Sequence, residues 1–346
     1  HIEGKATAVP VAAGKSAEGW ASRKLHTIDN MYAILRGAGE APVNPWLANL
    51  GGFVRNWTTA SVLGAAWLPS LVTDPLYQMT ARRFMGLKQL RTYRDIAAQF
   101  KGANRDEAVR AGLILDSALN VLGEEARFAG SQSGPELSRR IADRVLTFSG
   151  LSPWTQAGKH AFGLGIMGEI ADRIADPFER LPEPLQRAFS GYGIDAADWD
   201  KMRAAPLHQP KDGVRFLRPN EIAETDMPLA ERYLGMILQE TEYAIPSGTV
   251  RGRATLLGNT RAGTLVGEVW RSAVMFKSFG MSFALLQGGR IARETTRGGK
   301  ANGAAYAGAL ALTMLLGGTL SIWLKDIASG RDPRPIGGPD GNPLPF

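Results

Sequence analysis

The stretch Ala301–Leu324, ANGAAYAGALALTMLLGGTLSIWL, decides how the fold is interpreted, because it holds 24 consecutive residues without a charge. Lys300 and Lys325 bracket it. As an α-helix it would extend about 36 Å, enough to cross a hydrocarbon core of about 30 Å. It is therefore either the central helix of a soluble core, buried on all sides, or a segment that enters a membrane. Its many alanines and glycines make it only moderately apolar, which favours the soluble core.

Small side chains within this stretch predict helix–helix packing. Gly303, Ala307 and Ala311 recur at every fourth residue, so they are expected to form a stripe where a second helix approaches closely. A glycine pair follows in the middle of the segment and weakens it, since glycine costs about 1 kcal/mol in a helix interior. The candidate residues of this packing or membrane segment are Gly303, Ala307, Ala311, Leu315, Gly317 and Gly318.

Positive charge gathers directly before the apolar stretch. The chain has a net charge of +7, and residues 251–300 alone contain nine lysines and arginines against Glu268 and Glu294. A cationic block beside a long apolar segment suits contact with phosphate, either of nucleic acid or of anionic lipid. The alternative is a solvated face whose cations form salt bridges with acidic parts of the fold or of a partner. The candidate phosphate contacts are Arg251, Arg253, Arg290, Arg293, Arg297 and Lys300.

Composition excludes several classes of site. The 346 residues include no cysteine, which rules out disulfides and cysteine-based zinc or iron–sulfur centres. The four histidines lie far apart and form no metal-binding spacing, so we expect no metal and no cofactor. The first residues contain no apolar core of a secretory signal. Because the chain starts without a methionine and ends in a Pro/Gly-rich tail, we expect it to be a piece of a longer polypeptide.

Hydrophobic periodicity predicts an all-α fold, an extended multi-helix assembly with one long apolar helix near the C-terminus. Nearly every segment has the 3.6-residue period and almost none alternates as a strand does. The clear irregular stretch is 204–220, with a short strand expected at Val214–Leu217. In chain order we expect an N-terminal arm and first helix (1–45), a helical body (46–250), a cationic linker and amphipathic helix (251–300), the apolar helix (301–330) and a Pro/Gly-rich tail (331–346).

Individual helices are predicted from caps, prolines and period. Pro69 is expected to bend or end the second of two apolar helices in 45–75. The longer predicted helices are Trp20–Leu35, Arg105–Phe128, Ser133–Phe148, Trp154–Ile174, Leu229–Ala244 and Thr264–Gln287.

Three tryptophans, Trp46, Trp57 and Trp67, follow one another at intervals of 11 and 10 residues, which is about three helical turns. Side chains at such spacing lie on similar faces of a helix. The common reason for this is packing in a core, and the alternative is a belt at a membrane interface.

Motifs for enzyme chemistry are not found. Gly163, Gly165 and Gly168 match the letters of a dinucleotide fingerprint but stand inside an apolar helical run instead of after a strand. No phosphate-binding loop or activated serine turn is present. Two carboxylate pairs, Glu124 with Glu125 and Glu240 with Glu242, are expected on solvated helix faces. We therefore predict that this segment is not an enzyme, although enzymatic domains can lie elsewhere in a longer chain.

Three stretches carry a family resemblance. They are Ser61–Pro75, SVLGAAWLPSLVTDP, followed by Phe84-Met85-Gly86; Tyr243–Phe283, which contains the letters FKSF; and the apolar run joined to LKDIASGRDPRP at Leu324–Pro335. In order and chemistry they resemble a region of the large internal virion proteins of tailed phages, including the large polyvalent proteins. The resemblance spans roughly residues 45–335, and its motif-like parts cover under a third of that span. No transglycosylase motif of that family is found here.

The resemblance implies a structural protein that is packaged inside the capsid, ejected with the genome, and used to form a conduit for DNA across the host envelope. Its expected partners are other virion proteins of the portal or internal core, packaged DNA bound without sequence preference, the host membrane and further copies of itself. It would lie in the virion interior and, after ejection, in the host cell envelope. Two alternatives remain: a domain of a polyvalent enzyme acting on peptidoglycan or nucleic acid, and an integral membrane protein with one span.

Overall fold

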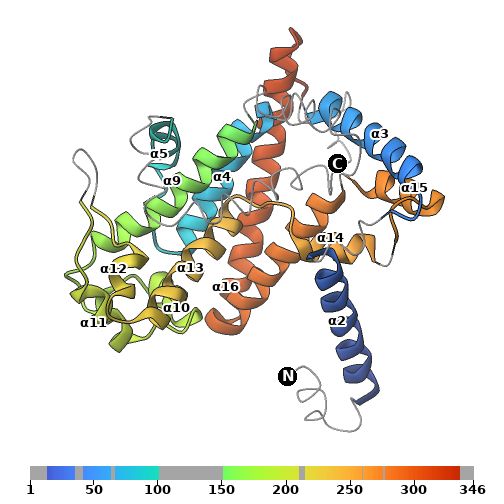
Figure 1. The fold of residues 1–346 in the computed structure, drawn as a ribbon. Helices are drawn as coiled ribbons and strands as arrows, with labels where there is room; N and C mark the ends of the chain where they lie inside the picture. The colour runs from blue at the N-terminus through green and yellow to red at the C-terminus, as the bar shows by residue number, and fades with distance from the viewer. Residues whose placement is uncertain are drawn as a thin grey trace. The chain divides into compact units, whose positions relative to one another are not determined.

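The computed structural model describes residues 14–35, 42–63, 67–100, 151–209, 215–258, 260–275 and 277–335. The fold is all-α, as predicted: the structure is 77% helical, with 12 helices and no strands among the described residues (Figure 1). The helices predicted at Arg105–Phe128 and Ser133–Phe148, the first 13 residues and the tail from 336 onward lie outside the described residues.

The chain divides into two compact units that are discontinuous in sequence. Among the described residues, unit 1 takes those up to Val62 and those of Ser247–Leu285, and unit 2 takes the others. The units therefore cut across the successive segments expected from composition: the cationic block 251–300 contributes to both, and the apolar helix belongs to unit 2.

Unit 1 contains α2 (Gly14–Leu35), α3 (Pro45–Leu63), α14 (Val250–Leu257), α15 (Leu265–Val274) and the beginning of α16 (Lys277–Ala328). Helix α2 packs against α14. Side chains cap several helices in the manner that polar residues before a helix predict. Asn44 accepts hydrogen bonds from the first turn of α3, Thr249 from Gly252 of α14, and Thr264 from Gly267 of α15.

Unit 2 contains a helical body with an apolar core. Three of its helices, α4 (Trp67–Phe84), α9 (Leu151–Ala171) and α13 (Met227–Ala244), contact one another. Four shorter helices complete the body: α5 (Thr92–Ala98), α10 (Glu183–Gly191), α11 (Ala196–Ala204) and α12 (Pro219–Ala223). A 3₁₀ turn, Phe178–Arg180, precedes α10.

The apolar core of unit 2 lies between α9, α10, α11 and α13. Trp199 of α11 is fully buried, its ring lies 5.4 Å from that of Phe189, and its indole N–H donates to the carbonyl of Asp176. Burial of such side chains is the main stabilising contribution to a domain of this size. The core also includes Phe162, Ile166, Met167, Ile170, Leu185, Ile194, Met202, Leu229, Tyr233, Met236 and Ile237.

Helix α16 is interrupted at Gly299, where φ is 81° and ψ is 169°. Such a backbone conformation favours glycine, because a Cβ is strained there. Beyond this glycine the helix runs without interruption to Ala328, through the Gly317-Gly318 pair that the sequence predicts to weaken it. The side-chain oxygen of Gln287 lies 2.5 Å from the hydroxyl of Tyr306, so the two halves of α16 turn back on each other at Gly299.

Several local predictions were wrong for identifiable reasons. Pro69 lies inside α4 and does not end it. Pro69 lies in the first turn, where a proline removes no helical hydrogen bond. The helix predicted at Thr264–Gln287 is instead two helices, α15 ending at Val274 and α16 beginning at Lys277, and α14 was missed. The expected strand near Val214–Leu217 is represented among the described residues by one isolated antiparallel bridge between His208 and Phe216.

Candidate functional site

The apolar half of α16, which comprises residues 301–324 beyond the break at Gly299, turns its large hydrophobic side chains outward. Six large apolar residues along it are exposed by 39–56% of their area. Of the 18-residue stretch of highest hydropathy in this helix, 22% is buried. Among the described residues it is the one helix long and apolar enough to cross a membrane. These exposed side chains are Leu312, Met314, Leu315, Leu316, Leu320 and Ile322. The expectation of a core helix buried on all sides is therefore not met.

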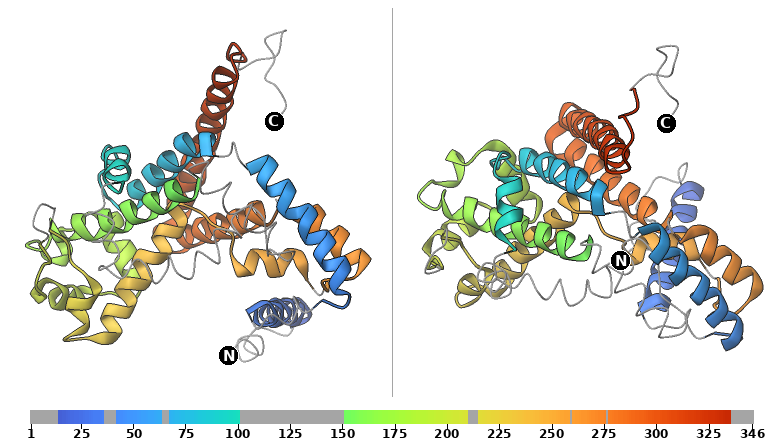
Figure 2. Two further views of the ribbon diagram at one scale, coloured as in Figure 1. Left: turned by 45° about the horizontal axis from the view of Figure 1, so that its top comes forward. Right: turned by 90° about the horizontal axis from the view of Figure 1, so that it is seen from above.

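The opposite face of this half-helix is buried and carries mainly small or polar side chains. Thr313 shares a 2.7 Å hydrogen bond with Thr80 of α4, and the Ser321 hydroxyl lies 3.4 Å from the carbonyl of Pro69. A Cβ built on Gly317 would lie 3.2 Å from the methyl of Thr73, so this glycine allows close approach to α4. Figures 1 and 2 show the two helices side by side. The buried face consists of Gly303, Tyr306, Leu310, Thr313, Gly317 and Ser321.

The predicted small-residue stripe is not this packing face. Gly303 is buried, but Ala307 is half-buried and Ala311 is exposed. A helix advances about 100° per residue, so a strict four-residue spacing rotates by about 40° at each step and leaves the contact. The observed face mixes steps of three and four residues and stays aligned. Of the other predicted residues, Leu315 is exposed, Gly317 is buried and Gly318 is half-buried.

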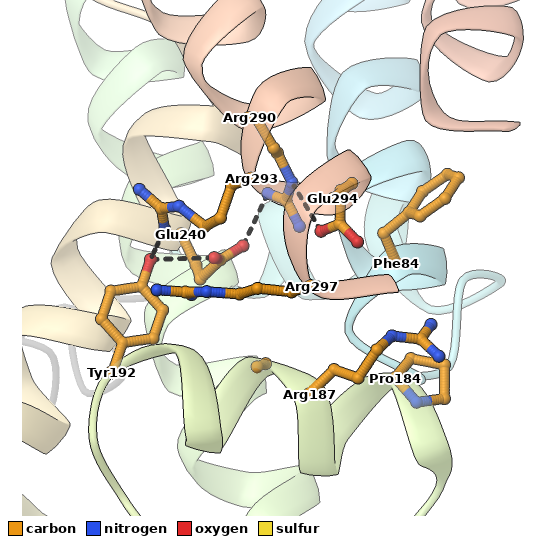
Figure 3. Close-up of a pocket in the computed structure, with 10 residues that line it drawn as sticks. Phe84, Pro184, Arg187, Tyr192, Glu240, Arg290, Arg293, Glu294 and Arg297 are labelled. Atoms are coloured by element: carbon orange, nitrogen blue, oxygen red, sulfur yellow. Dashed lines mark hydrogen bonds and ion pairs between the residues drawn. The ribbon is translucent and has the colours of Figure 1, made fainter. Parts of the chain in front are cut away.

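An ionic cluster lies beside the N-terminal end of the apolar half of α16 (Figure 3). Arg290 of α16 and Glu240 of α13 form an ion pair of 2.6 Å, and both side chains are at most 5% exposed. The Tyr192 hydroxyl donates to Glu240 over 2.9 Å. Arg293 donates to the hydroxyls of Tyr192 and Tyr243 over 3.0 and 2.7 Å. Glu240 thus pairs directly with Arg290 and is linked to Arg293 through the Tyr192 hydroxyl.

Aromatic rings complete the setting of Arg290. Its guanidinium carbon lies 4.7 Å from the ring centroid of Tyr243 and 5.1 Å from that of Tyr306, within the range of cation–π attraction. Tyr306 belongs to the apolar half of α16, beyond the Gly299 break. The cluster therefore contacts both halves of α16, since Arg290 precedes the break and Tyr306 follows it.

Protonation states in the cluster follow from burial and charge. Burial, reinforced by Glu240, raises the pKa of Tyr192, so the phenol keeps the proton it donates. Burial alone lowers the pKa of Arg290, but Glu240 and further neighbours outweigh it, and the net pKa is raised. Burial raises the pKa of Glu294, a shift that Arg290 opposes at an Nε–Oε1 distance of 3.9 Å. Arg290 therefore stays cationic, and Glu294 takes up a proton at a higher pH than an ordinary glutamate does.

Around this cluster a hollow carries an excess of arginine over carboxylate. It has about 350 Å³ of empty space, open solvent included. Four arginines and two glutamates line it, from α10, α13 and α16, together with Phe84 of α4 (Figure 3). The lining is net positive, and no group of His, Cys, Asp or Glu that could hold a metal occurs among the described residues. The charged residues are Arg187, Arg290, Arg293, Arg297, Glu240 and Glu294.

The six residues predicted to contact phosphate differ in exposure and in whether they already have a partner. Arg290 must be withdrawn, because its side chain is buried and its charge is paired with Glu240. Arg293 and Arg253 are half-buried, and Arg293 is already engaged with two tyrosines. The exposed members of the set are Arg251, Arg297 and Lys300.

Of the two carboxylate pairs considered for catalysis, Glu240 and Glu242 do not form a catalytic dyad. Glu240 is bound to Arg290, and Glu242 accepts a 2.9 Å hydrogen bond from Lys159. Both were expected on a solvated helix face, yet Glu240 is buried. Glu124 and Glu125 lie outside the described residues.

Sequence reasoning missed a second set of outward apolar side chains, on α3 and α15 of unit 1. Trp46, Leu50, Phe53 and Trp57 recur at steps of four, three and four residues, and all are exposed. That spacing was the available signal. The core interpretation of the tryptophans at 46 and 57 is wrong, because they are 71% and 60% exposed. The side chain of Trp67 lies outside the part of the chain that the structure describes.

Comparison with protein-family models, with curated proteins and with solved structures finds no match for this chain.

Proposed function

We propose that this chain is a structural protein that enters a lipid bilayer through residues 301–324 of α16. The observation that supports this most is the orientation of the helix: its leucines face outward while threonine, serine and glycine face α4. In water the opposite orientation is stable, because apolar area is removed from solvent. In hydrocarbon the observed one is stable, because lipid solvates leucine, and small and polar residues join helices.

The surroundings of the helix fit the same proposal. Lys300 precedes the uncharged stretch and is exposed. Lys325 follows it and is exposed as well, so each end of a membrane-spanning segment would have a cation at headgroup level. Threonine and glycine on the inner face permit a neighbouring helix, α4, to enter or abut the bilayer with it.

The biological setting that we propose rests on the resemblance to tailed-phage internal virion proteins. The chain would be packaged in the capsid as a homo-oligomer beside portal or core proteins, and it would help to form a conduit for DNA across the host envelope. Arg251, Arg297 and Lys300 are the exposed cations available to DNA phosphates. A map of the particle that places this chain in the virion interior tests this part; detection of the chain only in cellular membranes contradicts it.

Protease protection on liposomes tests the bilayer proposal. We expect a fragment containing 301–324 to be shielded. Leu315→Arg puts a charge at the centre of the segment, which costs about 2.5–3.5 kcal/mol and should reduce insertion by roughly 100-fold. Leu90→Arg is the matched control, because Leu90 is 94% exposed outside the helices and should leave insertion unchanged. If the wild-type protein yields no shielded fragment, the bilayer proposal is wrong.

Salt-dependent DNA binding tests the phosphate contacts. Replacing Arg251, Arg297 and Lys300 with Gln should flatten the salt dependence of the binding constant by about 0.9 logarithmic unit for each phosphate that is no longer neutralised. Arg215→Gln, an exposed change outside the cationic block, is the control. An unchanged slope in an anisotropy titration would show that these cations do not contact DNA.

A further inference from the structure

Helices α3 and α15 of unit 1 turn apolar side chains toward solvent and polar side chains inward, which is the reverse of an amphipathic helix in water. On α3, the exposed fractions run from 45% for Phe53 to 71% for Trp46; on α15, from 45% for Trp270 to 77% for Val266. The side turned inward carries charges and amides instead. The exposed apolar residues are Trp46, Leu50, Phe53, Val54, Trp57, Leu265, Val266, Val269 and Trp270, and the buried polar ones are Arg55, Asn56, Thr59, Glu268 and Arg271.

A buried ion pair joins the two helices from within. Arg55 of α3 and Glu268 of α15 lie 2.6 Å apart with side chains 5% and 6% exposed. The other oxygen of Glu268 accepts from the backbone N–H of Gly263 over 2.8 Å. Breaking such a buried pair leaves an uncompensated charge, so the inward orientation of the polar side is firmly held.

Backbone contacts fix the same two helices at their N-terminal ends. The N–H of Val43 donates to the carbonyl of Ala262 over 2.9 Å. A Cβ on Gly263, whose φ is 74°, would lie 2.5 Å from the carbonyl oxygen of Asn44, so only glycine permits this approach. The two helices lie side by side in both views of Figure 2. Their outward faces therefore belong to one packed pair of helices.

We propose that this pair, the α3–α15 surface, is a second membrane contact that lies in the interfacial plane of an anionic bilayer without crossing it. For its membrane the inference rests on the proposed function. With 10 residues, α15 extends about 15 Å and is too short to span. Helix α3 has Arg55 near its middle, held on the inward side. Such helices lie flat, with one face in the acyl boundary.

Charge and aromatic placement point to lipid as the occupant. In the sequence of 42–63 and 247–285 there are six cationic residues and one acidic residue, Glu268, which is paired inside. Arg251, Arg261 and Lys277 are exposed, and anionic headgroups complement them. Tryptophan favours the interface between headgroups and acyl chains. A protein partner is the competing occupant, and fluorophore labelling distinguishes the two.

Single-cysteine labelling tests the surface, and the absence of native cysteine makes it direct. A polarity-sensitive fluorophore would be attached at Phe53→Cys, Val266→Cys, Leu315→Cys and, as the control on an exposed face of α11, Asp200→Cys. Phosphatidylcholine–phosphatidylglycerol vesicles would carry a quencher at either a shallow or a deep position of the acyl chain. We expect shallow quenching at 53 and 266, deep quenching at 315, and none at 200.

The outcomes separate the two proposals. Quenching at 315 with none at 53 and 266 overturns the α3–α15 surface and leaves the proposed function standing. Shallow quenching at 53 and 266 with none at 315 overturns the spanning helix and supports the surface. A blue shift at 53 and 266 that grows with protein concentration in the absence of vesicles assigns the surface to a second copy of the chain, and overturns the lipid inference.

A matched pair of variants provides an independent check. Leu50→Asp with Val266→Asp should weaken vesicle partitioning roughly tenfold or more, because both charges enter the proposed acyl boundary. Asn49→Asp adds a charge at an exposed position beside the stripe and should have little effect. All of these side chains are exposed, so circular dichroism should report unchanged helix content. Equal weakening in both variants would indicate simple charge repulsion from the anionic surface and contradict the inference.

Discussion

The helical body of unit 2 buries its large apolar side chains, whereas the apolar half of α16 exposes them. In the body, Trp199, Phe189 and Leu185 are fully buried and charges such as Lys201 lie outside. In the C-terminal half of α16, leucines lie outside and Thr313 and Gly317 lie inside. Because burial follows the surrounding solvent, the core of the body has the pattern of a protein in water, and the outward leucines of the half-helix are the reason for proposing an apolar medium around it.

The largest expected effect contrasts two tryptophans. Trp199→Ala should lower the free energy of unfolding by about 3–5 kcal/mol, since it empties a buried site and removes a hydrogen bond to Asp176. Trp57→Ala should change it by at most about 0.5 kcal/mol in water, because its ring is 60% exposed. Chemical denaturation measures both, and comparable destabilisation would show that the outward faces are buried in solution.

The ionic cluster provides the next test. Glu240→Gln should destabilise the fold by about 3 kcal/mol, because Arg290 is left as a buried cation without its carboxylate. Glu231→Gln, on an exposed position of the same helix, is the control and should be nearly neutral. Equal unfolding midpoints for the two variants would show that Arg290 finds another partner or water.

Two adjacent glycines test which face of the apolar helix is packed. Gly317→Leu should cost about 1–3 kcal/mol, since its Cβ would already lie 3.2 Å from Thr73 before the larger side chain is added. Gly318→Leu has no heavy atom within 4 Å and should be neutral or stabilise by up to about 1 kcal/mol through helix propensity. Thermal unfolding of both variants decides; the reverse order would place the helix differently against α4.

The smallest expected effect is a change in pH dependence at Glu294. Burial raises the pKa of Glu294, so the folded state retains this proton at a pH where the unfolded state has lost it. Its contribution to stability is therefore present at low pH and declines as the pH rises above the ordinary value of about 4.5 toward the raised pKa. Glu294→Gln should remove that decline. Denaturation of both proteins across this range measures it, and parallel curves would contradict the assignment.

Much of the fold followed from local pattern. The 3.6-residue period predicted the helices, and the helix expected to begin at Thr264 does begin there, with Thr264 as its N-cap. The break at Gly299 was not predicted. Gly298 and Gly299 form a pair of the kind that marks turns, but the glycine pairs at 288–289 and 317–318 remain helical, so such a pair by itself does not locate the break. Pro69 failed as a stop signal because its effect depends on its distance from the helix start.

The sequence by itself determined that Ala301–Leu324 is a long uncharged helix preceded by cations, since length and charge are properties of consecutive residues. Only the tertiary structure decided which way its side chains face, that Arg290 lies inside rather than at a phosphate, and that Arg55 meets Glu268. Each of these depends on a partner on another helix: Thr313 bonds Thr80, Arg290 pairs with Glu240, and Glu268 lies 213 residues from Arg55. Period and composition report how a helix is divided into faces, whereas the neighbour that each face meets is set by packing over distances along the chain that no local pattern records.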